Sequence, residues 1–295
     1  MQITTEKGKQ LRGDIIKRAV LRYDMTPVPA TFEGEFRADS DMKKQLAEGK
    51  AINVNGDNFR IIKPVDGAGR DSQGTHDTGV MRITALLDAC HAVTFVRDKS
   101  IIKENALLTE IYRASGATIK PVDNDFKAER FACPIGETPS FNIARVLQEE
   151  GGAVRWKNGK IKFFRLQDLF KQKAAMTLPD NANENVVSGF LERHQVPSFY
   201  SIDASGAIIY GNRSKARSAM FVPRKNQQQL INMSRVLVHR KESKISFNPG
   251  LFAGDLIDFG TVKLVVVTVA HVLESGTDGS GSNQYTKLWC SALGS

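Results

Sequence analysis

Two Asn-Gly pairs, each placed between short apolar runs, constrain the fold of this chain more than any other feature. They are Asn55-Gly56 and Asn158-Gly159. Both residues of such a pair tolerate positive φ, which the tight turn of a two-residue hairpin requires. Each pair therefore predicts an antiparallel β-hairpin. Because the two pairs are far apart in the chain, antiparallel sheet should make up much of the fold.

Alternation of apolar and polar side chains extends this pattern into the first and last thirds of the chain. Residues 31–37 alternate at period two, which is typical of a half-buried strand. The run 19–24 comes before it, and Pro27 and Pro29 predict a turn between the two. The last third predicts further strands at 235–238, 244–247, 256–259, 263–269 and 284–290.

Other segments depart from the strand pattern. Helical periodicity covers 106–114, which ends before Gly116, and 140–150, which follows Pro139. The polar, glycine-rich stretch 66–79 has no apolar periodicity and predicts an exposed loop, and 172–186 has the composition of a linker. The sequence thus predicts a mainly β (α+β) protein with a small helix-hairpin insertion.

Composition narrows the classes of function. The chain of 295 residues has 41 Lys and Arg against 32 Asp and Glu, a formal net charge of +9. These basic residues are dispersed, whereas a dedicated nucleic-acid site concentrates charge on one face or helix. The three cysteines have no CxxC spacing and predict reduced thiols. We expect no membrane helix, and residues 1–7 lack the apolar core of a secretory signal.

Residues able to carry chemistry are present, but their spacing predicts no reactive site. Asp258-Phe259-Gly260 matches the metal-binding tripeptide of kinases, yet the accompanying kinase motifs are missing, so we interpret it as a strand end followed by a turn glycine. His271 lies in a β-branched run and is expected to be a half-buried strand histidine bonded to a neighbour. The sequence therefore predicts no catalytic residue, no cofactor site, no metal site and no enzymatic activity.

The C-terminal third has an ordered series of motifs. Pro249-Gly250 is followed by Gly254-Asp255, then by the β-branched run that ends at His271, then by a polar loop at 276–282, and finally by Tyr285-Thr286 before a last strand. This order resembles the end of the phage baseplate or tail hub family, which is related to the first part of type VI secretion spike proteins. The helix, glycine turn and hairpin at 139–164 resemble the middle of the same family.

The resemblance implies a structural role. Family members form a homotrimeric ring in which each subunit carries two tail-tube-like β-barrel domains, so that six barrels match a six-fold tube and adapt it to a three-fold spike. The implied partners are the tail tube protein, the spike or tip protein, other baseplate proteins and the tape measure, with DNA only passing through the lumen. The implied location is the tail baseplate of a virion assembled in the host cytoplasm.

The boundaries and contact residues that follow are also predictions. We expect residues 1–65 with about 175–245 to form the first barrel, 80–174 to form a helix-containing middle domain, and 246–295 to complete a barrel. Interfaces are expected where unpaired backbone groups at a sheet edge bond to another chain, first at the edge strands near 32–37 and also at the strand 263–269. The residues predicted at these interfaces are Phe32, Phe36, Val265, Val267 and Tyr285.

Two other classes of function remain open at this stage. One is a tail-associated β-rich enzyme such as a cell-wall hydrolase, which needs a converging acid and base; Glu149 and Glu150 are adjacent on a helix and do not converge. The other is a carbohydrate- or DNA-binding β module. Such a module needs clustered aromatic residues, but Trp156 and Trp289 are far apart in sequence.

Overall fold

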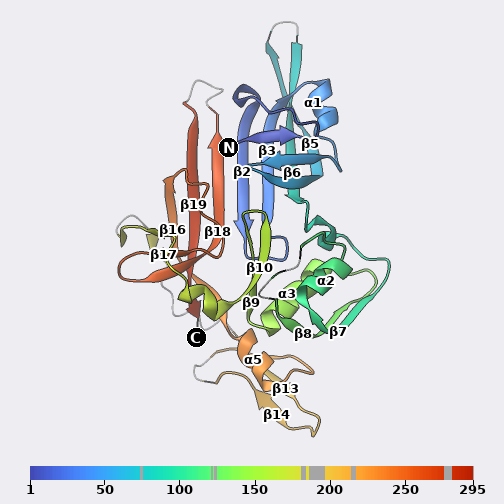
Figure 1. The fold of residues 1–295 in the computed structure, drawn as a ribbon, viewed down its shortest axis with the longest axis vertical. Coiled ribbons are helices and arrows are strands. Elements are labelled where there is room, and N and C mark those ends of the chain that lie inside the picture. The colour runs from blue at the N-terminus through green and yellow to red at the C-terminus, as the bar shows by residue number, and fades with distance from the viewer. Residues whose placement is uncertain are drawn as a thin grey trace.

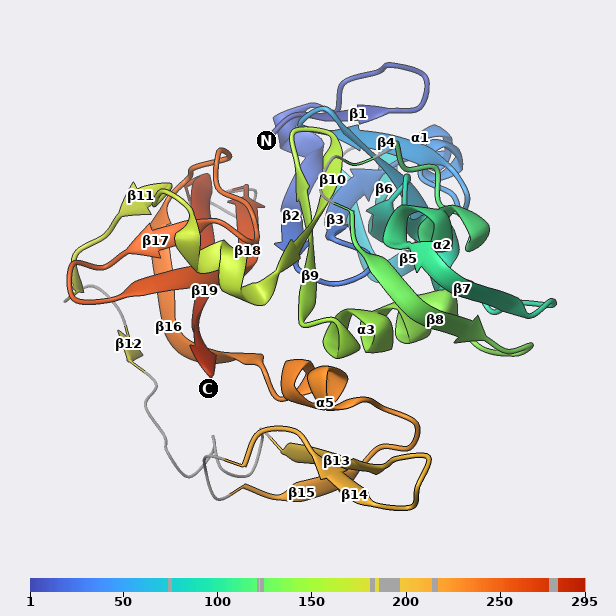
Figure 2. The same cartoon turned by 60° about the horizontal axis from the view of Figure 1, so that its bottom comes forward.

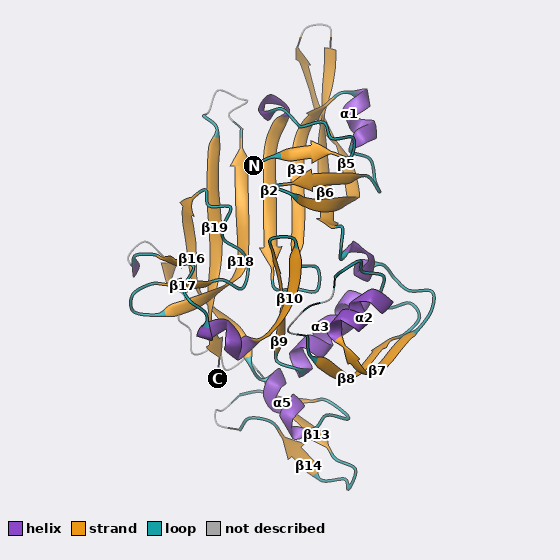
Figure 3. Cartoon of the chain, in the orientation of Figure 1, coloured by secondary structure: helices purple, strands orange, loops and turns teal. Residues whose placement is uncertain are grey.

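The structure is a computed structural model that describes residues 1–73, 76–120, 122, 125–180, 184–185, 197–213, 217–275 and 281–294. Antiparallel strands dominate it, which confirms the predicted mainly β fold (Figures 1 and 3). Most of the polar loop 276–282 and part of the predicted linker 172–186 lie outside the described residues.

One large sheet organises the molecule and contains 12 of the described strands. Its strands neighbour one another in the order β1 (Ile3–Thr5), β4 (Ala51–Val54), β5 (Asp57–Gln73), β6 (His76–Leu87), β3 (Ala30–Ala38), β2 (Ile16–Asp24), β18 (Lys263–Glu274), β19 (Asn283–Gly294), β16 (Val236–Ser246) and β12 (Glu184–Asn185). Off this path, β17 (Leu256–Asp258) pairs with β18 and with β11 (Met176–Thr177).

The first and last thirds of the chain meet where β2 pairs with β18. The two strands are antiparallel, with Val20 opposite Val272 and Leu21 opposite His271. We call this pairing the seam. The strands fall into an N-terminal and a C-terminal group on either side of it, and Figure 2 shows that each group curls round on itself.

Alternating side chains fill the core of the N-terminal group. Phe32 and Phe36 on β3 point the same way and are fully buried, and the ring of Phe32 lies 6.2 Å from that of Phe59 on β5. The Asn-Gly turn forms as predicted, with positive φ of 51° at Asn55 and 95° at Gly56. Two short helices flank this group, the 3₁₀ helix η1 (Gly13–Ile15) and α1 (Ser40–Gln45).

The prediction of an exposed loop at 66–79 is wrong. The described part of this segment continues β5 and β6, with Gly67 opposite Val80 and Ser72 opposite Asp77. Strand pairing uses backbone N–H and C=O groups, so a register set by the apolar parts of two strands can continue through polar and glycine residues. Figure 1 shows this hairpin extending beyond the rest of the sheet.

The middle of the chain forms the predicted helix-hairpin insertion. The 3₁₀ helix η2 (His91–Thr94) leads to β7 (Ile101–Leu107), α2 (Leu108–Ala114), β8 (Lys127–Cys133) and α3 (Pro139–Glu149). The hairpin of β9 (Gly152–Lys157) and β10 (Lys160–Arg165) follows, and the 3₁₀ helix η3 (Leu166–Lys171) ends the unit. The turn between β9 and β10 has positive φ at Asn158 and Gly159, as the sequence predicts.

A small peripheral unit follows the insertion. Its strands β13 (Ser198–Ile202), β14 (Ile208–Tyr210) and β15 (Ala219–Phe221) form a separate sheet, and α5 (Gln227–Met233) covers one face of it. Leu230 and Met233 of α5 pack with Phe199 of β13. The range 175–245 therefore contains this unit and also β16, which pairs with β19 in the C-terminal group. The domain boundaries given above remain predictions.

Candidate assembly surfaces

Three of the five predicted interface residues lie inside the chain's own core. The side chains of Phe32, Phe36 and Val265 are fully buried. Their strands are also not at an edge, because β3 lies between β2 and β6, and β18 lies between β2 and β19. The prediction of an edge strand at Phe32 and Phe36 is therefore wrong. Alternation indicates that one face of a strand is buried, but it does not show whether the strand has a neighbour on each side in the same chain.

Val267 and Tyr285 are half-buried and remain candidates for contact with another chain. Val267 lies where the register of β18 against β19 shifts between Val266 and Thr268. The ring of Tyr285 receives the ammonium of Lys244, which lies 3.9 Å from the ring centroid. The register shift at Val267 and the contact of Tyr285 with Lys244 do not show whether either residue takes part in assembly.

Near each end of the large sheet, one strand has a side along which another described strand pairs for only a few residues. Along β16, β12 pairs only with Lys241 and Glu242, and no other described strand pairs with that side. Along β5, β4 pairs only as far as Arg60, so in the described part of the chain the rest of β5 pairs with β6 alone. Such edges are templates for strand addition from another chain.

The peripheral unit presents an apolar face that α5 does not cover. Residues paired across neighbouring strands share a face, and Tyr200 pairs with both Tyr210 and Phe221 while Ile202 pairs with Ile208. Ile208 is 56% exposed and Phe221 is 46% exposed. An apolar face of this kind on a soluble protein usually marks a contact surface. The alternation of residues 198–202 could have indicated it.

Asp255 occupies the corner formed by the Pro-Gly and Gly-Asp motifs. Its carboxylate is 3% exposed and accepts hydrogen bonds from the Arg155 guanidinium, from Lys157 Nζ at 2.8 Å and from the backbone N–H of Phe252 at 2.9 Å. Gly254 has φ of +83°, and a Cβ there would lie 3.2 Å from Arg155 Cδ. The corner thus fixes the β9–β10 hairpin against the C-terminal strands.

His271 fixes the other side of the same corner and is fully buried rather than half-buried. Its Nε2 lies 3.1 Å from the Leu251 carbonyl oxygen, and its Nδ1 lies 3.0 Å from Thr286 Oγ1. Because a carbonyl only accepts, Nε2 donates and Nδ1 accepts from the threonine hydroxyl. Burial lowers the pKa of His271 to about 4, which favours this neutral form. The predicted bond to a neighbour is confirmed.

The other motifs noted in the sequence have structural rather than chemical roles in the described residues. Asp258 ends β17 and its carboxylate accepts the N–H of Gly260, which has positive φ, so the interpretation as strand end and turn is confirmed. Cys90, Cys133 and Cys290 are buried free thiols. Among the residues that the structure describes, no three His, Cys, Asp or Glu side chains are grouped as a metal ion would need. No described helix has the length and hydropathy to cross a membrane.

Comparison with solved structures identifies the class of fold. A tail protein from Neisseria meningitidis matches 99% of this chain and 95% of its own, with a TM-score of 0.62 and 12% identity. The 43 kDa tail protein of prophage MuSo2 from Shewanella oneidensis matches 98% of this chain and 96% of its own, with a TM-score of 0.60 and 14% identity. A type VI secretion component from E. coli, described as similar to bacteriophage tail proteins, matches 98% and 76%, with a TM-score of 0.56 and 10% identity.

The chain therefore has the fold shared by phage tail proteins and type VI secretion components, which confirms the resemblance drawn from the sequence at the level of the fold. No protein-family model and no curated protein sequence matches the chain.

Proposed function

We propose that this protein is a structural hub subunit of a phage-type tail baseplate. The observation that carries the proposal is the fold, which matches tail proteins over nearly the whole length of both chains. In this role the protein works by geometry: it belongs to the virion tail, catalyses no reaction and needs no cofactor.

The arrangement of the sheet supports assembly as a homotrimer. The two groups of strands on either side of the seam give each chain two curled units. Three chains in a ring present six such units to a six-fold tail tube and keep three-fold symmetry toward the spike. A ring of this kind leaves a lumen through which DNA passes without sequence-specific contact.

The sides of β16 and β5 that carry only a short described partner strand support head-to-tail contact. They lie toward opposite ends of one sheet, and a heterologous interface joins two different surfaces of the same chain. When the rotation between subunits closes, such an interface makes a ring. The tube protein, the spike or tip protein, other baseplate proteins and the tape measure are then the partners of the assembled ring.

Negative-stain electron microscopy of the purified protein, alone and mixed with the tail tube protein encoded beside it, tests this function. We expect rings with three-fold symmetry and six peripheral densities, and rings capping the ends of tubes in the mixture. Isolated particles that never associate with tubes would contradict the proposed role.

A further inference from the structure

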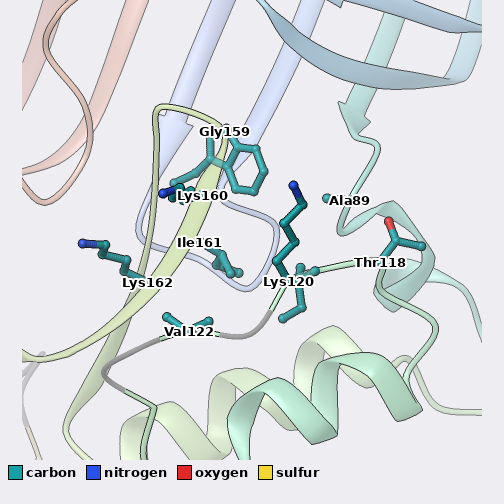
Figure 4. A pocket seen from close by; sticks show the side chains of 10 residues that line it. Ala89, Thr118, Lys120, Val122, Gly159, Lys160, Ile161 and Lys162 are labelled. Carbon is teal, nitrogen blue, oxygen red and sulfur yellow. The ribbon is translucent and has the colours of Figure 1, made fainter.

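One face of the β9–β10 hairpin gathers four cations around a recess of about 420 Å³. Strand alternation places Lys160 and Lys162 on the same side of β10. In the pairing with β9, these two lysines lie opposite Lys157 and Arg155. Figure 4 shows the side chain of Lys162 pointing away from the neighbouring apolar cavity, whereas Ile161 points toward it. The four charges therefore lie on the side of the hairpin opposite that cavity.

Among the described residues, a single carboxylate contacts this cationic face, and it binds only the cations of β9. Asp255 is 3% exposed and forms ion pairs with Arg155 and Lys157. Lys160 and Lys162 are exposed, and neither forms an ion pair or hydrogen bond with a residue that the structure describes. Four cations against one carboxylate leave a net charge of +3 on this face.

This unbalanced charge lowers the stability of the free chain. Like charges directly opposite one another destabilise an antiparallel pair, and both cross-strand pairs nearest the turn on this face are of that kind. Asp255 shows how such charge is compensated, because its carboxylate contacts two cations at once. A carboxylate from another molecule could do the same for Lys160 and Lys162.

The spacing of side chains along β10 determines the form of a matching ligand. Residues two apart on a strand lie about 6.6 Å apart, and an extended polypeptide repeats at the same interval. Acidic side chains at alternate positions of such a segment therefore meet both Lys160 and Lys162. Phe164 continues the same row and lines the recess half-buried. The next alternate position of the segment therefore meets an aromatic ring.

We infer that this face binds an extended acidic segment of a partner polypeptide. The segment carries carboxylates at two alternate positions and an apolar side chain at the next one. Double-stranded DNA fits the face less well, because a DNA-binding surface neutralises many phosphates. In the described part of the chain only two cations of this recess, Lys160 and Lys162, lack a partner.

Fluorescence anisotropy with labelled synthetic peptides tests the inference on the full-length protein. In the probe, serines separate two glutamates and a phenylalanine, so that these three lie at alternate positions. One comparison peptide has glutamines in place of the glutamates, and the probe should bind about 10-fold more tightly than this peptide. A second has the same composition with adjacent glutamates, and a third has serine in place of phenylalanine. The probe should bind about 3-fold more tightly than either, and its binding should weaken as salt is raised.

Variants locate the binding on the hairpin. Lys160→Gln with Lys162→Gln should weaken binding of the probe about 10-fold. The matched control, Lys7→Gln with Lys9→Gln, removes the same charge from two exposed positions that are also two apart, and it should leave affinity unchanged. The hairpin variant also removes the like-charge pairs, so its thermal midpoint should not fall below that of the unmodified protein.

Four results would overturn the inference. They are no binding of the probe, equal binding of the peptide with adjacent glutamates, an equal loss of affinity in the matched control, or tighter binding of duplex DNA than of the probe. A fall in the thermal midpoint of the hairpin variant would also contradict it, because the lysines would then stabilise the free chain. The proposed ring is tested separately, because the mass of the protein alone is measured without any peptide.

Discussion

Arg155 on β9 donates to the carboxylate of Asp255, 100 positions further along the chain, and the pair is almost completely buried. Lys157 donates to the same carboxylate. One acid therefore binds two cations and joins the middle insertion to the C-terminal strands.

Replacement of Asp255 should lower the free energy of unfolding substantially. Asp255→Asn keeps the size of the side chain but leaves two cations without a counter-charge, and breaking a buried pair in this way costs about 3 kcal/mol or more of unfolding free energy. Urea denaturation measures the loss. The control Asp168→Asn removes an exposed partner of Lys171 and should cost less than about 1 kcal/mol. Equal effects of the two variants would show that the corner is not held by charge.

Acid should destabilise the protein through His271. Its pKa is about 4 in the folded chain against 6.5 as the ordinary value, so the unfolded chain binds the extra proton first as the pH falls. The stability from the neutral histidine is complete above pH 6.5 and is lost between pH 6.5 and about 4, by about 3 kcal/mol in all.

Comparison with His271→Gln isolates this contribution, because glutamine does not titrate in the range. Urea midpoints of the two proteins at pH 7, 5.5 and 4 should converge as the pH falls. A constant difference between them would mean that His271 does not titrate as described.

Proline should destabilise the protein more in the regularly paired part of β18 than at the register shift of the same strand. Val269 pairs with Leu288 on one side and Tyr23 on the other, so Val269→Pro removes a ladder hydrogen bond and should cost about 3 kcal/mol or more. From the sequence, a proline at Val267 is expected to unfold the last sheet. Val267 lies at the register shift, so Val267→Pro should cost less. Thermal unfolding of both variants checks the order, and a reversed order would contradict this placement of the shift.

The uncovered face of the peripheral unit should tolerate polar residues. Ile202→Ser with Ile208→Ser changes exposed side chains and should alter unfolding free energy by no more than about 0.5 kcal/mol per site. Phe199→Ser, on the face that α5 covers, should cost at least about 2 kcal/mol. Chemical denaturation distinguishes the two. A large loss in the double variant would mean that this face is packed within the chain.

Local signals in the sequence predicted local structure well. The Asn-Gly turns, the helices that end before Gly116 and Gly151, and the strand alternation of residues 31–37 all correspond to described elements. Each depends on a few adjacent residues and their backbone conformations.

Features set by pairing between distant segments were not predictable in the same way. The outer β5–β6 hairpin extends through polar residues because its register is set elsewhere. The predicted strands 235–238 and 244–247 are one strand, β16, which β19 holds together across an irregularity between His239 and Lys241. Phe32 was predicted to lie in an edge strand because the sequence does not show that β6 pairs alongside its strand, β3.

The mass of the purified protein in solution, measured by size-exclusion chromatography with multi-angle light scattering, tests the proposed ring most directly. The account predicts a species of three times the 32.6 kDa chain mass that persists on dilution to low micromolar concentration. A single species at the mass of one chain, at every concentration up to the solubility limit, would contradict it.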